Sequence, residues 1–454
     1  MEQPNIVFLF SDQQRWDTCG CYGQPLTVTP NLDRMAAEGV RFENAFTCQP
    51  VCGPARACLQ TGKYATEVGC HINHRLLPLD EKTMAHYLKE QGYDTAYIGK
   101  WHLASFGADR GPDDFRVRPV PPERRGGYEY WLASDVLEFT SHSYDGCMFD
   151  GDGNKRMFPE GRYRVDAQTD WVIEYLLSRK DKRTPFFLFV SYIEPHHQND
   201  HGHFEGPHGS KEAFKDFVTP GDLIGTAGDW CEEYPDYLGC IHSLDQNVGR
   251  ISETLKESGL MDNTLLIYTS DHGSHFCTRN SEYKRSCHDG CIRIPMILRG
   301  PGFTGGVVRR ELVSLIDLPP TILNAAAPPE DKRLFPQRNM RGRPLHELVS
   351  GGVQDWPEEV FLQISESQCG RAIRTAKWKY SVRAPQKTGS DPDSDVYEED
   401  FLYDLESDPH ERNNLIANPD YSGIRKDLAR TLKRRMVEAG EVEPEIRERE
   451  REVS

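Results

Sequence analysis

Two short apolar segments of the chain each end in a pair of residues that could bind a metal ion. The pairs are Asp12-Gln13, after residues 6–10 (IVFLF), and Asp271-His272, after residues 265–269 (LLIYT). Two carboxylates, an amide and an imidazole suit Ca²⁺, Mg²⁺ or Mn²⁺ better than a structural zinc ion. A single aspartate after a strand is more often a turn or cap residue, so the metal hypothesis depends on all four residues meeting at one place.

Basic residues occur in similar positions elsewhere in the chain. They are Arg56 in CGPARACLQTGK (residues 52–63), Lys100 and His102 in GKWH (99–102), and His196 after FFLFVSYI (186–193). A divalent cation beside several basic groups makes a site for a tetrahedral oxyanion such as phosphate or sulfate. These residue types therefore predict a metal site that handles an anion.

Cys52 stands four residues before Arg56, and four roles are open to it: buried thiol, disulfide half, metal ligand or nucleophile. Pro54 is favoured in the first turn of a helix, which places Cys52 at a helix N-terminus, where backbone N–H groups favour anions. A cysteine nucleophile needs a nearby histidine base, whereas a metal-bound oxygen nucleophile does not. These residues alone leave the choice open.

The apolar segments named above, together with residues 93–98 (YDTAYI), have the length of buried parallel strands. Helical patterns separate them, at residues 29–39, 82–92, 165–180 and 237–259. Strands that alternate with helices predict an α/β fold with a large mixed, mostly parallel sheet between layers of helices. Such sheets bind ligands beyond the carboxyl ends of their strands, so the polar residues are expected to converge at one sheet edge.

The chain is expected to divide into a catalytic domain at residues 1–355 and a smaller C-terminal domain at residues 356–454. In the C-terminal part, VFLQIS and KWKYSV read as antiparallel strands and a charged helix starts near residue 423, which predicts an α+β domain. Residues 105–164 and 197–236 are expected to be excursions that select the substrate. The charged residues at the end of the chain are expected to be solvated or a packing arm.

Charge and cysteine content restrict the partner and the compartment. The net charge of −17 over 454 residues argues against nucleic acid and an anionic membrane surface as partners. The apolar run at residues 6–10 is too short for a signal peptide or a membrane span. Thirteen cysteines, an odd number without a small-domain framework, predict free thiols and a cytoplasmic location.

Two motifs and several longer stretches are typical of one known family. The motifs are C-x-P-x-R followed by Thr-Gly, present as Cys52, Pro54, Arg56 and Thr61-Gly62, and GYDTAYIGKWHL at residues 92–103. The longer stretches are residues 29–46, 262–273, 292–302 and 402–415. In these residues the chain resembles the type I sulfatase family of the alkaline phosphatase superfamily, and the resemblance covers nearly the whole chain.

The resemblance implies hydrolysis of a sulfate ester by a modified cysteine. In this family the signature cysteine is oxidised after synthesis to formylglycine, so a formylglycine-maturation enzyme is an implied partner. At Cys52 the hydrated aldehyde would attack sulfur through one oxygen, the alcohol would leave, and the second hydroxyl would help to expel sulfate. The family pattern also implies one divalent cation, with Ca²⁺ as the first choice and Mg²⁺ or Mn²⁺ as alternatives.

The resemblance also implies a role for each site residue. The implied metal ligands are Asp12, Gln13, Asp271 and His272. Arg56 and Lys100 would lie beside the hydrate and the metal, and His102 would be the base for sulfate expulsion. His196 and Lys284 would bind the sulfate and protonate the leaving oxygen. Lys284 is aligned only by its distance before IRIPMI (292–297), and a surface lysine is the other interpretation.

The ester that the enzyme hydrolyses could contain phosphorus instead of sulfur. Many family members carry paired aspartates after the first strand, whereas this chain has Asp12 and Gln13, a pair that phosphonate monoester hydrolases also use. A phosphate or phosphonate ester is therefore the alternative substrate, and the modification signature favours sulfate. A cytoplasmic enzyme meets substrates small enough to be imported, so a small sulfated mono- or disaccharide or an aryl sulfate is expected.

A non-catalytic, zinc-stabilised binding protein is a second alternative. The spacings Cys48-x3-Cys52 and Cys287-His288-x2-Cys291 are tolerated by zinc sites, and five histidines crowd residues 196–208. Using Cys52 as a zinc ligand would leave Pro54, Arg56 and the GKWH motif without a function.

Overall fold

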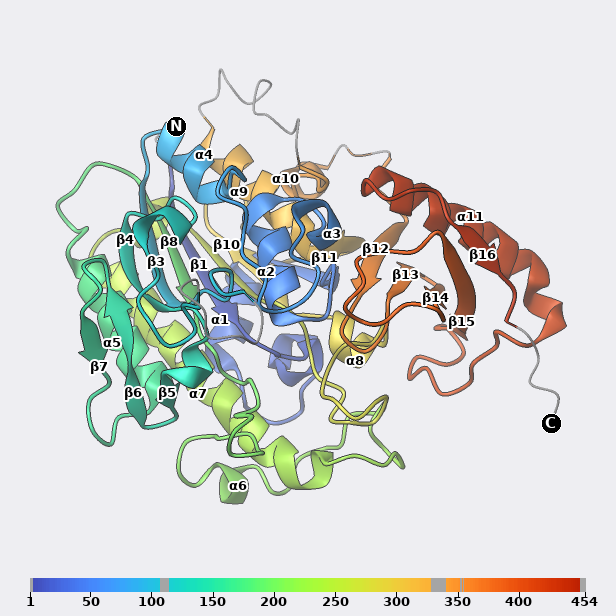
Figure 1. Ribbon diagram of the computed structural model, residues 1–454. Helices are drawn as coiled ribbons and strands as arrows, with labels where there is room; N and C mark the ends of the chain where they lie inside the picture. The colour runs from blue at the N-terminus through green and yellow to red at the C-terminus, as the bar shows by residue number, and fades with distance from the viewer. Residues whose placement is uncertain (1–2, 107–113, 328–339, 352, 354, 450–454) are drawn as a thin grey trace.

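The computed structural model describes residues 3–106, 114–327, 340–351, 353 and 355–449 (Figure 1). These residues form two β-sheets, and the larger one has eleven strands. Its order is β11 (Val307–Ser314), β2 (Val40–Phe46), β10 (Met296–Arg299), β9 (Thr264–Ser270), β1 (Asn5–Ser11), β8 (Phe186–Ser191), β3 (Asp94–Lys100), β4 (Tyr130–Ser134), β6 (Asp145–Asp150) and β5 (Ser141–His142), with β7 (Lys155–Met157) paired to β6.

The centre of this sheet is parallel, which confirms the predicted mixed, mostly parallel α/β fold. Strands β9, β1, β8, β3 and β4 are parallel neighbours, whereas β10 is antiparallel to both β9 and β2. Ser11 pairs with Ser270, and Gly99 pairs with Ser191. This register brings the carboxyl ends of the central strands to the same edge of the sheet.

Helices cover both faces of the larger sheet because its central strands are apolar on both sides. Val7 and Leu9 of β1 pack in one core with α1 (Pro30–Glu38), α5 (Arg164–Leu177) and α7 (Trp230–Glu257). Phe8 and Phe10 face the opposite core, with α2 (Cys52–Thr61), α4 (Met84–Glu90) and α9 (Leu318–Ala326). Every residue of β1 from Ile6 to Phe10 is fully buried, as a strand between two helical layers must be.

The remaining helices are short, and one long helix differs from the prediction. The four-residue helices are α3 (Ala65–Val68), α6 (Ser210–Ala213), α8 (Asp289–Ile292) and α10 (His346–Val349). Helix α7 begins at Trp230, seven residues before the expected start, and contains Pro235. Acidic residues in its first turn favour that start, and the proline costs only one backbone hydrogen bond. No described helix is both long and apolar enough to cross a lipid bilayer.

The expected excursion at residues 105–164 contributes to the larger sheet. Its described part contains β4, β5, β6 and β7, which extend the sheet beyond β3. Residues 107–113 lie outside the described residues. The second excursion, residues 197–236, contains α6 and the start of α7.

The C-terminal part forms the second sheet, which Figure 1 shows beside the larger one. Its order is β12 (Glu359–Ile364), β13 (Gly370–Thr375), β14 (Trp378–Arg383), β15 (Val396–Asp404) and β16 (Glu445–Arg447), and α11 (Ser422–Glu438) packs against it. Strands β12 to β15 are antiparallel, as predicted. The charged tail is partly ordered, since β16 pairs in parallel with β15 through its backbone.

The C-terminal sheet holds the loop between β9 and α8 (residues 271–288). Lys379 of β14 is fully buried and forms ion pairs with Glu411 and with the first residue of α8. Within the loop, Arg285 pairs with Glu366 at 2.6 Å. Lys284 belongs to the same loop, so contacts with the second sheet position a predicted site residue of the first.

Candidate active site

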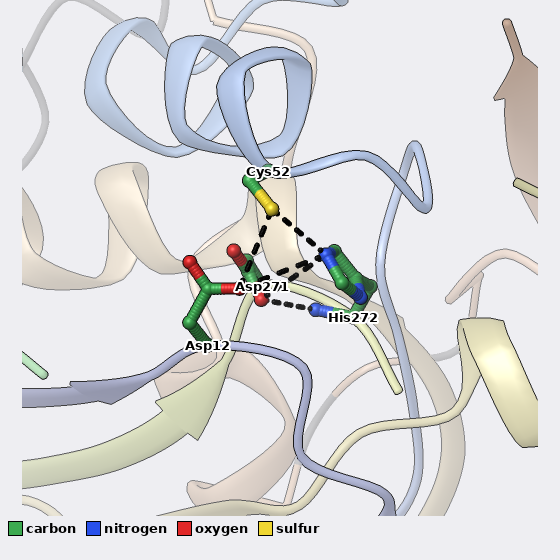
Figure 2. A group of neighbouring side chains, drawn as sticks. All are labelled: Asp12, Cys52, Asp271 and His272. Carbon is green, nitrogen blue, oxygen red and sulfur yellow. Dashed lines mark hydrogen bonds and ion pairs between the residues drawn. The ribbon is translucent and has the colours of Figure 1, made fainter. Parts of the chain in front are cut away.

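The predicted site residues meet at the carboxyl edge of the larger sheet. Figure 2 shows Cys52, at the start of α2, pointing toward Asp12, Asp271 and His272. The Cys52 Sγ lies 3.3 Å from Asp12 Oδ1 and 3.2 Å from His272 Nε2. One potential ligand atom from each of these four residues lies within 4.8 Å of the others, and all four residues are buried.

Helix α2 begins at Cys52, which confirms the prediction that Cys52 lies at a helix N-terminus. Pro54 is the third helical residue, where its missing N–H has no helical acceptor to lose. Gly53 follows Cys52 because a Cβ there would lie 2.9 Å from Asn73 Oδ1, which accepts the Gly53 N–H at the same distance. The helix ends at the predicted Gly62, whose φ is +71°. The cysteine is therefore held at the first turn of a fixed helix.

The two aspartates have opposite electrostatic environments. Burial would raise the pKa of Asp12, but Lys100, His196 and Arg56 lower it well below the ordinary value. Burial and the nearby Asp12 carboxylate raise the pKa of Asp271 to about 7. Asp271 Oδ2 is buried and accepts no hydrogen bond from the described residues. Asp271 therefore has weaker positive compensation than Asp12, since Arg56 lies 3.6 Å from its Oδ2 but 2.9 Å from Asp12 Oδ2.

These donors fit a divalent cation. His272 Nδ1 lies 2.8 Å from the Gly273 carbonyl oxygen, which assigns the proton to Nδ1 and leaves the Nε2 lone pair facing the carboxylates. Burial lowers the pKa of His272 well below its ordinary value, so the imidazole is neutral. A neutral imidazole beside two carboxylates, one of them with an oxygen that accepts no hydrogen bond from the described residues, is a ligand set that could hold a metal ion.

Gln13 lies beside this ligand set. Its backbone N–H donates to Asp271 Oδ1 at 2.9 Å, and its side-chain amide donates to Ser274 Oγ at 3.5 Å. Its φ of +72° lies in the left-handed region, which non-glycine residues occupy at a cost. Surrounding structure has to hold such a residue in place, and functional sites are where such residues concentrate.

Arg56 and Lys100 neutralise Asp12 from two sides. The Arg56 guanidinium donates to Asp12 Oδ2 at 2.9 Å and to Ser191 Oγ at 2.7 Å, and Lys100 Nζ lies 2.7 Å from Asp12 Oδ2. Burial opposes the charge of both cations, but the Asp12 carboxylate raises the pKa of each above its ordinary value. The glycine before Lys100 is required because a Cβ at Gly99 would lie 1.9 Å from the Ser191 carbonyl oxygen.

His196 and Lys284 form a pair on the other side of Cys52. Lys284 Nζ lies 2.9 Å from Cys52 Sγ and 3.1 Å from His196 Nε2. His196 Nδ1 lies 2.6 Å from the His197 carbonyl oxygen and 3.2 Å from Glu138 Oε2. Burial and Lys284 lower the pKa of His196 well below its ordinary value. Lys284 therefore carries the proton and His196 accepts from it, and the alternative of a surface lysine at this position is wrong because Lys284 is buried.

His102 is a buried imidazole without a partner. Neither ring nitrogen forms a hydrogen bond with the described residues, and the nearest aromatic ring, that of His74, is 5.4 Å away between centroids. Burial and Lys100 lower the pKa of His102 well below its ordinary value. Its φ is +61°. A neutral imidazole with unused nitrogens can accept a proton from a molecule bound beside it.

Cys52 is a poor thiolate in these surroundings. Burial and the Asp12 carboxylate raise the pKa of its thiol to about 12, against the opposing effect of Lys284 and Lys100. The cysteines of the zinc alternative are not gathered into a site among the described residues. Cys48 lies in the core under the larger sheet, and the other members, Cys287 and Cys291, lie in an apolar cluster beside the C-terminal sheet.

Sequence reasoning missed three residues that contact this site. Ser191 ends the strand before His196, so its position after an apolar run was the available signal. Glu138 lies in a short 3-10 helix (Leu137–Phe139) and Asn73 in an irregular segment, and no local sequence pattern marks either residue. Their proximity to His196 and to the start of α2 arises only from the folded arrangement.

Comparison with known proteins agrees with the family resemblance of the sequence motifs. A sulfatase family model matches residues 4–328, and a model of the N-sulphoglucosamine sulphohydrolase C-terminal region matches residues 281–438. An ulvan-active sulfatase of Formosa agariphila is 29% identical, covering 97% of this chain and 82% of the relative. An N-acetylglucosamine-6-O-sulfatase of Bacteroides thetaiotaomicron is 27% identical, covering 98% and 88%.

A solved structure shares the whole architecture. The yidJ protein of Bacteroides fragilis is 27% identical and superposes with a TM-score of 0.81, covering 97% of this chain and 96% of that one. The family match extends over more than half of this chain and includes the strands that carry Asp12, Lys100 and Asp271. The chain belongs to the sulfatase family, the type I sulfatases of the alkaline phosphatase superfamily, and is a hydrolase of sulfuric esters.

Proposed function

We propose that this chain releases inorganic sulfate from the sulfate ester of a small sugar, with formylglycine at position 52 and one divalent cation. The observation that supports this most directly is the position of Cys52. Its Sγ lies within 3.3 Å of Asp12, His272 and Lys284, between the candidate metal ligands and a protonated amine. The raised pKa of the thiol also argues for a modified residue at this position rather than a thiolate nucleophile.

The proposed metal ligands are Asp12, Gln13, Asp271 and His272. Oxygen donors dominate this set, so Ca²⁺ is the proposed ion, with Mg²⁺ and Mn²⁺ as alternatives. When bound, such an ion polarises an oxygen of the sulfate group and makes an oxygen nucleophile more acidic. Asp271 Oδ2, which is buried and accepts no hydrogen bond from the described residues, supports a cation at this place.

The basic residues are proposed to orient Asp12, bind the sulfate and transfer protons. Arg56 and Lys100 stay charged and hold Asp12 in one orientation, while His102 accepts the proton as sulfate is expelled. Lys284 and His196 contact the sulfate and supply the proton that the leaving alcohol oxygen needs. One water is consumed overall, the sulfur–oxygen bond to the alcohol breaks, and the products are the free alcohol and sulfate.

The proposed substrate class is a sulfated mono- or disaccharide. Two relatives have names that describe action on ulvan and on N-acetylglucosamine-6-O-sulfate, which are sulfated carbohydrates. Residues 105–164 and 197–236 are proposed to select the sugar, and Glu138 beside His196 belongs to the first of these segments. None of the thirteen cysteines, all of which the structure describes, is in a disulfide, so a cytoplasmic location is proposed, and maturation of Cys52 by a formylglycine-generating partner completes the proposal.

Substrate panels test this function. Matured enzyme is expected to release sulfate from at least one sulfated monosaccharide or disaccharide, with kcat/KM at least about tenfold above that for the matching phosphate and phosphonate esters. Ion chromatography of released sulfate and phosphate measures both. Turnover of a phosphonate or phosphate ester, with no sulfate released from any sugar or aryl sulfate, would assign the chain to the alternative chemistry.

His196→Ala is expected to affect substrates according to their leaving groups. An alkoxide from a sugar needs a proton as it departs, whereas a nitrophenolate does not, and general acid catalysis contributes about 10²–10⁴-fold. We therefore expect kcat for a sugar sulfate to fall about 100-fold and kcat for 4-nitrophenyl sulfate to fall much less. An equal loss on both substrates would show that His196 only binds sulfate. His208→Ala, which removes an exposed histidine of the following loop, is the control.

A further inference from the structure

A second group of metal-binding side chains lies on the surface, outside the candidate active site. We call it the histidine cluster; its members are His142, Asp200, His201, His203 and Glu205. It contains two overlapping triads, His142-Asp200-His201 and His201-His203-Glu205. In each triad, one potential ligand atom per residue lies within 4.8 Å of the others. His201 belongs to both triads.

Distances within the histidine cluster match those around a small metal ion. His142 Nε2 lies 3.0 Å from Asp200 Oδ2, and His203 Nε2 lies 3.9 Å from Glu205 Oε1. His201 Nδ1 also contacts Glu205 Oε1. Ligands bound tetrahedrally to Zn²⁺ at its usual bond lengths are about 3.3 Å apart. A zinc ion would replace these direct contacts once the stacked rings of His142 and His201, 4.5 Å apart between centroids, turn toward one point.

The histidine cluster is open to solvent and differs in chemistry from the active site. The side chains of His142, His201 and His203 are 37%, 40% and 46% exposed, and they line a cavity of about 510 Å³. Three imidazoles with two carboxylates favour Zn²⁺ or a similar transition metal, whereas the oxygen-rich active site favours a hard cation. The two sites can therefore hold different metals at the same time.

The histidine cluster joins two segments that both contact His196. His142 ends β5 in the first excursion, whereas the other four residues lie in the loop that follows His196. Glu138, four residues before His142, lies 3.2 Å from His196 Nδ1. We propose that the histidine cluster is a second metal site, for Zn²⁺ or a similar transition metal, which ties these two segments together beside the active site.

Zinc titration tests the proposal. Enzyme saturated with Ca²⁺ is expected to take up one Zn²⁺ per chain in calorimetry, confirmed by elemental analysis. His201→Ala removes the ligand that both triads share. Mutating a residue that only hydrogen-bonds to a metal ligand typically weakens metal binding by roughly 10–100-fold, and we expect a larger loss of zinc affinity in His201→Ala. His142→Ala and His203→Ala each remove one triad, so their losses identify the ligands. His208→Ala is the control, because His208 lines the same cavity, stacks on Tyr144 and belongs to neither triad.

Hydrogen exchange gives a second measurement, independent of affinity and activity. Zn²⁺ is expected to slow amide exchange at residues 141–146 and 198–205 in the unaltered enzyme but not in His201→Ala. The substituted side chains are on the surface, and thermal unfolding without zinc shows whether each variant is folded. Zinc uptake that His201→Ala leaves unchanged, and that Asp271→Asn abolishes, would place the zinc at the active site and overturn the proposal.

Discussion

Asp271→Asn is expected to reduce kcat/KM for sulfate release by about 10³-fold or more, with no bound divalent cation left in the active site. A metal ion supplies several kcal/mol of transition-state stabilisation, and each 1.4 kcal/mol is tenfold in rate. The substitution is close to isosteric: Asn keeps the Oδ1 that accepts the backbone N–H groups of Gln13 and His272, both at 2.9 Å. It replaces Oδ2, which accepts no hydrogen bond from the described residues and lies 3.6 Å from Arg56, and so removes mainly the proposed metal ligand.

Asp317→Asn is the matched control for that experiment. Asp317 is also a buried carboxylate whose pKa burial raises, to about 6, and it accepts backbone N–H groups from Ser314 and Arg343 at 2.8 Å. It has no contact with the site residues, so its variant should keep full metal content and activity. Kinetics and elemental analysis on both variants give the comparison. Unaltered turnover by Asp271→Asn, or by chelated enzyme shown to be metal-free, would contradict the metal mechanism.

Protein produced without a formylglycine-maturation system is expected to be nearly inactive, about 10³-fold or more below matured protein, although correctly folded. Its Cys52 thiol, with a pKa of about 12, is almost entirely protonated at neutral pH and cannot act as a thiolate nucleophile. In matured protein, the peptide with residue 52 should resist thiol alkylation, react with carbonyl reagents and have a lower mass than the cysteine form. Peptide mass spectrometry with sulfate assays on the same samples measures both.

Cys58 provides the internal control for the alkylation experiment. It lies in the same helix and is fully buried, but it packs in the apolar core beneath the larger sheet. After unfolding, Cys58 should be alkylated to the same extent in matured and unmatured protein. Fully active enzyme with an alkylatable thiol at position 52 in every molecule would disprove the proposed role of Cys52.

The strands that carry the site could be predicted because each is a continuous apolar run. A strand that is buried on both faces needs apolar residues at nearly every position, which makes it recognisable in the sequence. Parallel neighbours end at the same edge of the sheet, so Asp12 and Asp271 are expected to meet there. The contact of Lys100 with Asp12 follows from the same reasoning. For these strands, the apolar composition of five or six consecutive residues is enough to place the segment in the central sheet.

Elements held mainly by backbone pairing could not be predicted in this way. The side chains of β7 and β16 are largely exposed, so their sequences show no apolar alternation, and each strand exists because a neighbour offers unpaired backbone groups. Glu138 is a similar case among site residues. It meets His196 across 58 positions of chain, because a three-residue 3-10 helix packs against a loop, and no local sequence pattern describes that contact.

The C-terminal sheet anchors the loop that contains Lys284, and this determines where chimeras between homologous enzymes can be joined. The C-terminal family match starts at residue 281, before Lys284, and continues to residue 438, so it takes in the loop together with the sheet that holds it. A chimera joined at the boundary between the two sheets would separate Arg285, the neighbour of Lys284, from Glu366 and leave Lys379 buried without its partner on α8. The unit that can be transplanted between homologues therefore begins inside the loop that holds Lys284, and this C-terminal module carries one of the proposed sulfate-binding groups with it.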